Sequence, residues 1–120
     1  MKKVLVVEDS LYIAEAIRIL LSPGVEVTHL NDANKALDLV KEKGFDLVIL
    51  DLMLPTSSGK DALLKLKADP ATKKVPVMVL TAKVDALRWE PEIGVCDKFV
   101  TKPFDNRRLV ADIMGLLEKK

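Results

Sequence analysis

Four short apolar runs in this sequence each end on a polar side chain of a kind that binds phosphate or metal ions. VLVV is followed by Glu8 and Asp9, LVIL by Asp51, VMVL by Thr81, and FVT by Lys102. If the runs are parallel strands of one sheet, their carboxyl ends meet at the same edge. Three carboxylates, a hydroxyl and an ammonium would then share one crevice.

The three carboxylates of this crevice predict a cation. Close carboxylates repel one another unless one keeps a proton or a cation joins them. Carboxylate oxygens without imidazole or thiolate ligands favour Mg²⁺, with Mn²⁺ as the alternative. The only histidine, His29, is expected on the second strand and away from this edge. Glu8, Asp9 and Asp51 are therefore the candidate metal ligands.

The same residues suit phosphoryl transfer. An aspartate carboxylate such as Asp51 can attack phosphorus and form an acyl phosphate. Catalysis of that step consists mostly of alignment and of charge neutralisation on the phosphoryl oxygens, for which the Lys102 ammonium and the Thr81 hydroxyl are suited. Singly, each residue has an ordinary reading, as a turn acid, a strand-end hydroxyl or a surface charge. Together, and in this order, they favour one site.

The elements that must position these residues alternate along the chain. Continuous or alternating apolar residues predict strands, and apolar residues at helical spacing predict helices. Pro91 would end or kink a helix at 84–90, so this fourth helix is expected to be short or irregular, and Asp105 is expected to cap the last helix. The predicted strands are 3–7, 26–30, 47–50, 75–80 and 97–100, and the other predicted helices are 10–21, 33–43, 60–67 and 106–119.

This alternation predicts an α/β fold, a doubly wound parallel sheet with helices on both faces. The loop after the first strand has no glycine before Gly24, so the G-x-G-x-x-G and Walker A motifs of nucleotide-binding folds are missing. The flavodoxin-like strand order 2-1-3-4-5 is therefore preferred, and it makes the first and third strands neighbours. We expect one domain over residues 1–120.

Composition restricts the possible partners. The net charge is +1 and is spread along the chain, which gives no general attraction to nucleic acid or to an anionic membrane. No apolar stretch approaches the length of a membrane span and no signal peptide is evident, so we expect a cytoplasmic protein. Cys96 is the only cysteine and is interpreted as a small apolar residue near the last strand.

The sequence resembles the receiver domain of two-component response regulators over essentially its whole length. Four separated motifs carry the resemblance, in matching order and spacing: VLVVEDS at 4–10, LDLMLP at 50–55 with Gly59, TA at 81–82, and FVTKPF at 99–104. The resemblance implies that Asp51 accepts a phosphoryl group from the phosphohistidine of a sensor histidine kinase or phosphotransfer protein. It implies a signalling switch rather than an enzyme that turns over external substrates, although the domain would assist its own phosphorylation and dephosphorylation.

The resemblance also implies further roles. Glu8, Asp9 and Asp51 would hold Mg²⁺ together with the backbone carbonyl of Met53. Thr81 and Phe99 would change position with the phosphorylation state, and the Lys102–Pro103 peptide bond would be cis. Met53 and Lys83 are expected near the path of the attacking water, where they would tune the lifetime of the phosphorylated state.

The expected partners, besides the kinase, are a downstream target or a fused output domain. The protein would be a monomer or a weak phosphorylation-dependent dimer. Lys98 and Asp112 reverse the charge pair expected on the dimerising face of related transcription factors, and we consider a contact between protomers and two unrelated surface charges as alternatives.

Two other functions remain open at this point. A phosphatase of the haloacid-dehalogenase type also uses an aspartyl nucleophile and Mg²⁺, but normally has a second aspartate where this chain has Met53. A receiver-like interaction module that is never phosphorylated typically lacks the acceptor or the lysine, and this chain has both Asp51 and Lys102.

Overall fold

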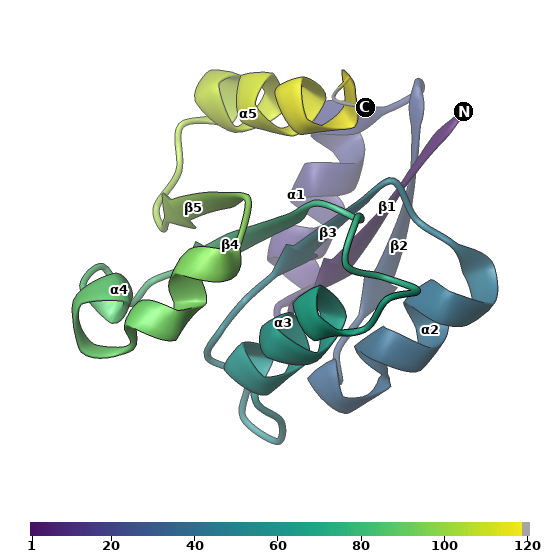
Figure 1. Ribbon diagram of the computed structural model, residues 1–120. Helices are drawn as coiled ribbons and strands as arrows, with labels where there is room; N and C mark the ends of the chain where they lie inside the picture. Colours follow the sequence, from purple (N-terminus) through teal and green to yellow (C-terminus); the bar gives the residue numbers. More distant parts are fainter. Residues whose placement is uncertain (119–120) are drawn as a thin grey trace.

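The structure is a computed structural model that describes residues 1–118 (Figure 1). Its centre is a five-stranded parallel sheet in the order β2-β1-β3-β4-β5, as predicted. Helices cover both faces, which makes the fold a doubly wound α/β fold of the flavodoxin-like type. The strands are β1 Lys2–Val7, β2 Val25–Leu30, β3 Leu47–Leu50, β4 Val77–Thr81 and β5 Lys98–Thr101. The helices are α1 Leu11–Leu21, α2 Ala36–Lys43, α3 Gly59–Ala68, α4 Ala86–Trp89 and α5 Asn106–Glu118, with 3₁₀ turns η1 Ala33–Lys35 and η2 Pro91–Val95.

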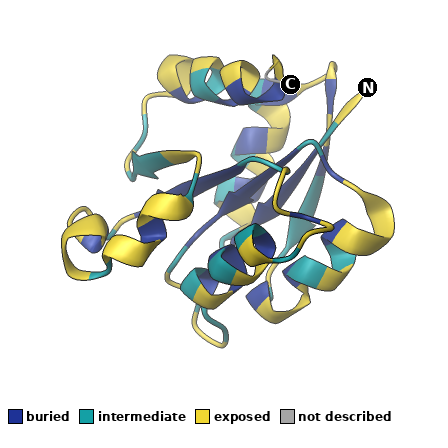
Figure 2. Ribbon diagram, in the orientation of Figure 1, coloured by how far each residue is buried: buried dark blue, intermediate teal, exposed yellow. Residues whose placement is uncertain are grey.

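Alternate residues of the central strands feed two separate hydrophobic cores. In β1, Val4 and Val6 pack with α1 and α5 on one face, whereas Leu5 and Val7 pack with α2 and α3 on the other. Every residue of β3 and β4 is buried (Figure 2), which explains why these strands are continuous apolar runs in the sequence. The rigid centre of the sheet therefore carries the strand ends at which the polar residues lie.

Local capping explains where several helices begin and end. Ser10 and Ser58 accept backbone N–H groups at the starts of α1 and α3, and Asp105 accepts the Arg108 N–H at the start of α5, as predicted. Gly44 ends α2 with a positive φ of 72°, a backbone angle that favours glycine. The predicted last helix included Lys119, which lies outside the described residues.

The fourth helix is short, as Pro91 predicted. α4 occupies only Ala86–Trp89 and is followed directly by η2. Ala86 and Ile93 anchor this α4–η2 segment in the core, while most of the side chains between them are exposed. The exposed apolar residues of the segment and its flanks are Val84, Leu87, Trp89 and Val95.

Some predicted boundaries differ from the structure. β4 begins at Val77 rather than at residue 75, because Pro76 has no N–H group to donate to the sheet and the Val77 N–H binds the Asp97 carboxylate. The Lys102–Pro103 bond is cis, as expected, and a second cis bond at Ser22–Pro23 was not predicted. Within residues 1–118, no helix has the length and apolar character needed to cross a bilayer.

Lys98 and Asp112 meet within the chain. The Lys98 Nζ lies 3.6 Å from Asp112 Oδ1, and the lysine side chain is well exposed. An intramolecular partner therefore satisfies each charge, so the reversed pair does not by itself require a contact between protomers.

Gly59 lets the start of α3 approach the end of β3. A Cβ atom at this position would lie 2.7 Å from the Cα of Leu52 and would overlap the backbone of Asp51 as well. Only glycine fits this approach without a shift of the backbone. Gly59 therefore supports the position of the Asp51 main chain.

We predict that Gly59→Ala lowers the free energy of unfolding by about 2 kcal/mol, because the methyl group meets backbone atoms that cannot rotate away. Gly115→Ala is the matched control, since among residues 1–118 a Cβ there has no neighbour within 4 Å and alanine favours the helix by roughly 0.5–1 kcal/mol. Urea denaturation of both variants measures the difference. Equal stabilities would contradict the proposed close approach.

We also predict that Cys96 reacts slowly with alkylating reagents. Its side chain is half-buried and packs against the core between the sheet and α2 and α3. Burial, and then the charge of Asp97, raise the pKa of the Cys96 thiol, so little thiolate is present at neutral pH. Iodoacetamide should label the folded chain several-fold more slowly than the chain unfolded in urea, and equal rates would contradict this environment.

Candidate functional site

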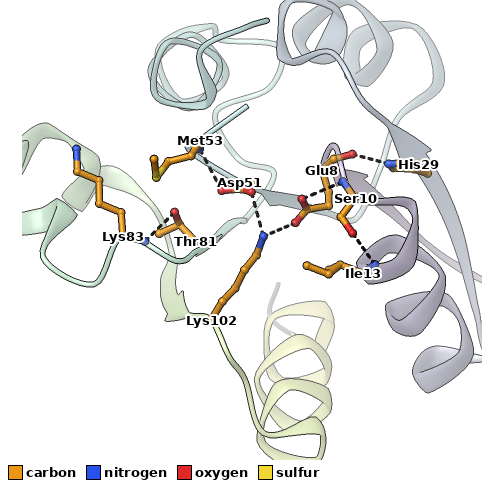
Figure 3. A network of polar contacts seen from close by, with 9 residues as sticks. All are labelled: Glu8, Ser10, Ile13, His29, Asp51, Met53, Thr81, Lys83 and Lys102. Atoms are coloured by element: carbon orange, nitrogen blue, oxygen red, sulfur yellow. Dashed lines mark hydrogen bonds and ion pairs between the residues drawn. The ribbon is translucent and has the colours of Figure 1, made fainter. Parts of the chain in front are cut away.

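The candidate site lies where β1 and β3 end side by side (Figure 3). Val7 and Leu50 are register partners, and the Asp51 N–H donates to the Val7 carbonyl at 3.0 Å. Glu8 and Asp51 are the next residues on these neighbouring strands, so parallel pairing brings their side chains together. The register of two buried strands therefore builds the centre of the site.

Three carboxylates cluster at this edge. One oxygen each from Glu8, Asp9 and Asp51 lies within 4.8 Å of the others. Glu8 and Asp51 are buried, whereas Asp9 is exposed. A set of carboxylate oxygens that is open to water on one side fits a hard cation such as Mg²⁺, which binds through one or two carboxylates and keeps several waters.

Lys102 bridges the two buried carboxylates. Its Nζ lies 2.7 Å from Glu8 Oε1 and 3.0 Å from Asp51 Oδ2. Burial opposes the charged ammonium, but the hydrogen bonds to Glu8 and Asp51 outweigh it and raise the pKa of Lys102. Among the described residues, the Lys102 ammonium is the cation bonded to this cluster, and one positive charge does not balance three carboxylates.

Backbone groups orient the same carboxylates. The Met53 N–H donates to Asp51 Oδ1 at 3.1 Å, and the Ser10 N–H donates to Glu8 Oε2 at 3.2 Å. Burial raises the pKa of Glu8, and the bonds to Lys102 and Ser10 oppose this rise only in part. Both buried carboxyl groups are thus held in fixed orientations.

His29 is nearer to the site than the sequence predicted. Its Nε2 forms a hydrogen bond with the backbone carbonyl of Glu8, because β2 pairs with β1 and places His29 opposite Val6. Figure 3 shows the ring on the side of Glu8 that faces away from Asp51. His29 lies on β2, as predicted, but the expectation that it lies away from this edge is wrong, because its ring contacts the backbone carbonyl of Glu8. Among the described residues, the candidate metal ligands are the three carboxylates without His29.

Thr81 and Lys83 lie on the β4 side of Asp51 (Figure 3). Thr81 is fully buried, and its Oγ1 accepts the Lys83 N–H at 3.3 Å. The Lys83 ammonium bonds instead to Glu90 at 3.2 Å, a contact that no periodic pattern predicts because the intervening segment is irregular. Phe99 lies in β5 and is half-buried against the core.

The structure thus brings Glu8, Asp9, Asp51 and Lys102 into one polar cluster, with the Met53 backbone at its edge. A buried aspartate with an adjacent ammonium and a candidate cation site has the parts needed to accept a phosphoryl group.

Comparison with known proteins identifies the family. The chain is an α/β domain of the flavodoxin-like type, and the sequence profile of the response regulator receiver domain matches residues 4–114. The chain belongs to the response regulator receiver domain family. It is 36% identical to the DNA-binding response regulator MtrA of Mycobacterium tuberculosis H37Rv, over 98% of this chain and 51% of that protein. It is 35% identical to the probable transcriptional regulator ycf29 of Pyropia yezoensis, over 98% of this chain and 54% of that protein.

Solved structures share the fold. A putative response regulator from Chloroflexus aurantiacus superposes with a TM-score of 0.87 at 27% identity, covering 98% of both chains. The receiver domain of the sensor histidine kinase PA1611 from Pseudomonas aeruginosa has a TM-score of 0.87 at 24% identity and 98% coverage of both chains, and carries a magnesium ion in its own active-site cleft. The latter likeness shows the fold alone. The present chain spans about half the length of the curated relatives it matches.

We predict that Lys102→Met lowers the free energy of unfolding by roughly 1–3 kcal/mol at neutral pH without divalent ions, because two buried carboxylates lose the hydrogen bonds of their shared partner. Lys98→Met is the control, since the Lys98 ammonium is well exposed and, among residues 1–118, its ion-pair partner is Asp112 at 3.6 Å; it should change stability by less than about 0.5 kcal/mol. Urea unfolding compares the two variants with the wild type. An unchanged stability of Lys102→Met would show that the ammonium does not offset the carboxylates.

Proposed function

We propose that this domain is a phosphorylation-dependent switch of a two-component pathway in which Asp51 accepts the phosphoryl group. The donor is the phosphohistidine of a sensor histidine kinase or phosphotransfer protein. An Asp51 carboxylate oxygen forms a bond to phosphorus as the bond between phosphorus and the imidazole nitrogen breaks, and the imidazole leaves with the bonding electron pair. The observation that carries this proposal is the buried Asp51 carboxylate, held by Lys102 and Met53 beside two further carboxylates.

Glu8, Asp9 and Asp51 would hold Mg²⁺ or Mn²⁺, with the Met53 carbonyl as a further ligand. The ion, when bound, neutralises charge on the phosphoryl oxygens. The Lys102 ammonium, already 3.0 Å from Asp51 Oδ2, would contact another phosphoryl oxygen.

Thr81 and Phe99 would report the phosphorylation state. The Thr81 Oγ1 accepts the Lys83 N–H, which leaves its O–H free to donate to a phosphoryl oxygen. Such a bond would draw the loop after β4 toward Asp51, and Phe99 on the adjacent β5 would repack. The added charge thereby favours one of two arrangements of the outer surface.

The whole of residues 1–120 would act as one receiver domain in the cytoplasm, where the kinase presents its phosphohistidine. The output would be a fused domain or a separate target, and this chain would leave any nucleic-acid binding to that output. The domain would be a monomer or a weak dimer when phosphorylated. It would assist its own phosphorylation and dephosphorylation without turning over other substrates.

Incubation with acetyl phosphate and Mg²⁺ tests the proposal. Intact-protein mass spectrometry should show a gain of one phosphoryl group that is absent without Mg²⁺ and absent in Asp51→Asn. Asp112→Asn, which alters the half-buried partner of Lys98 on α5, should gain the group like the wild type.

Two results would replace this function with another. Steady hydrolysis of a generic phosphate ester that Asp51→Asn abolishes would indicate an aspartyl phosphatase. No mass gain with acetyl phosphate or with a phosphorylated kinase would indicate an interaction module that is not phosphorylated.

A further inference from the structure

Four charged side chains form a network beside the candidate site. Lys60 in the first turn of α3 lies 3.1 Å from Glu90 and 2.7 Å from Glu92, and Lys83 lies 3.2 Å from Glu90. Glu90 follows α4 directly and Glu92 lies in η2. The network therefore connects α3, the loop after Thr81 and the α4–η2 segment.

Glu90 is the shared acceptor between the two lysines. Its hydrogen bonds to Lys60 and then to Lys83 lower the pKa of the Glu90 carboxyl group. Hydrogen bonds to Glu92 and Glu90 raise the pKa of Lys60. The Lys83 ammonium has Glu90 as its carboxylate partner.

The Lys83 ammonium has a second possible position. Leu50 pairs with Val79, so Asp51 is level with Leu80 on a strand about 4.8 Å away. Lys83 follows Thr81 by two residues, or ~7 Å of chain, and its backbone is fixed to the Thr81 hydroxyl. Its flexible four-carbon stem can turn toward Asp51, yet Figure 3 shows the ammonium directed away from it.

We propose that Glu90 is a positioning residue that holds the Lys83 ammonium away from Asp51 until a phosphoryl group competes for it. A phosphoryl group carries about −1.5 to −2 charges, against −1 for a carboxylate. On exchange, Lys83 leaves Glu90 and contacts a phosphoryl oxygen, and Glu90 keeps only Lys60. The α4–η2 segment then loses its ionic contact with the loop after Thr81. This inference rests on the proposed function of Asp51.

The exchange has a thermodynamic consequence. A phosphoryl mimic bound at Asp51 can contact the Lys83 ammonium only after the ion pair between Lys83 and Glu90 is broken. The free energy of breaking this ion pair weakens the apparent affinity of the mimic. Removal of the Glu90 charge removes this competition. An ion pair between partly exposed groups corresponds to a change of about two- to fivefold in affinity.

Beryllofluoride with Mg²⁺, a mimic of the acyl phosphate, provides the test. Its affinity for the full chain is measured by ¹⁹F NMR of the bound species. We expect Glu90→Gln to bind it about two- to fivefold more tightly than the wild type, and Lys83→Met to bind it more weakly by a similar factor. In the Lys83→Met background, Glu90→Gln should have no further effect.

Glu92→Gln is the matched control, because within residues 1–118 Glu92 contacts Lys60 but not Lys83, and it should bind like the wild type. An equal gain from Glu90→Gln with and without Lys83 would overturn the inference, as would equal affinities of the wild type and Glu90→Gln. Absence of beryllofluoride binding to the wild type at Asp51 would instead overturn the proposed function itself, so the two failures are distinguishable.

Discussion

The ion pairs of Lys102 with Glu8 and Asp51 are the interactions on which this site depends. Two carboxylates that are almost fully buried would be costly without a nearby cation, and their positions follow from the register of β1 and β3. The two carboxylates cannot move apart unless β1 or β3 shifts, and residues of both strands belong to both hydrophobic cores. The ammonium therefore offsets part of the free-energy cost of burying the two carboxylates close together. Its single charge does not balance the cluster, which remains suited to a divalent cation.

The unusual part of the fold lies one strand away from this cluster. α4 has a single turn and is held by Ala86 and Ile93, by the turns of η2, and by ion pairs to α3 and to the loop after Thr81. A longer helix would be fixed by its own backbone hydrogen bonds and by a full apolar face. In this chain, ion pairs between charged side chains contribute more to holding the α4–η2 segment in place. Such ion pairs can exchange partners when an anion of higher charge, such as a phosphoryl group, binds nearby.

The parts of this structure that follow from local rules could be predicted from the sequence. Continuous apolar runs indicated β3 and β4, the strand ends indicated the carboxylate cluster, and Pro91 indicated a short α4. The contacts of His29 with Glu8 and of Lys60 with Glu90 could not be predicted, because the first depends on strand register and the second on an irregular segment. The roles of Glu8, Asp9, Asp51 and Lys102 remain predictions, although the structure places them together.

Trp89 is the last residue of α4 and directly precedes Glu90. Its indole N–H is bonded to Asp85, and the Arg88 guanidinium lies over its ring. It is the only tryptophan of the chain and is 66% exposed. Its ultraviolet emission therefore comes from a single, hydrated indole within the α4–η2 segment. The molecule thus contains an intrinsic optical probe of this segment, and its rearrangements can be followed in real time without an attached dye.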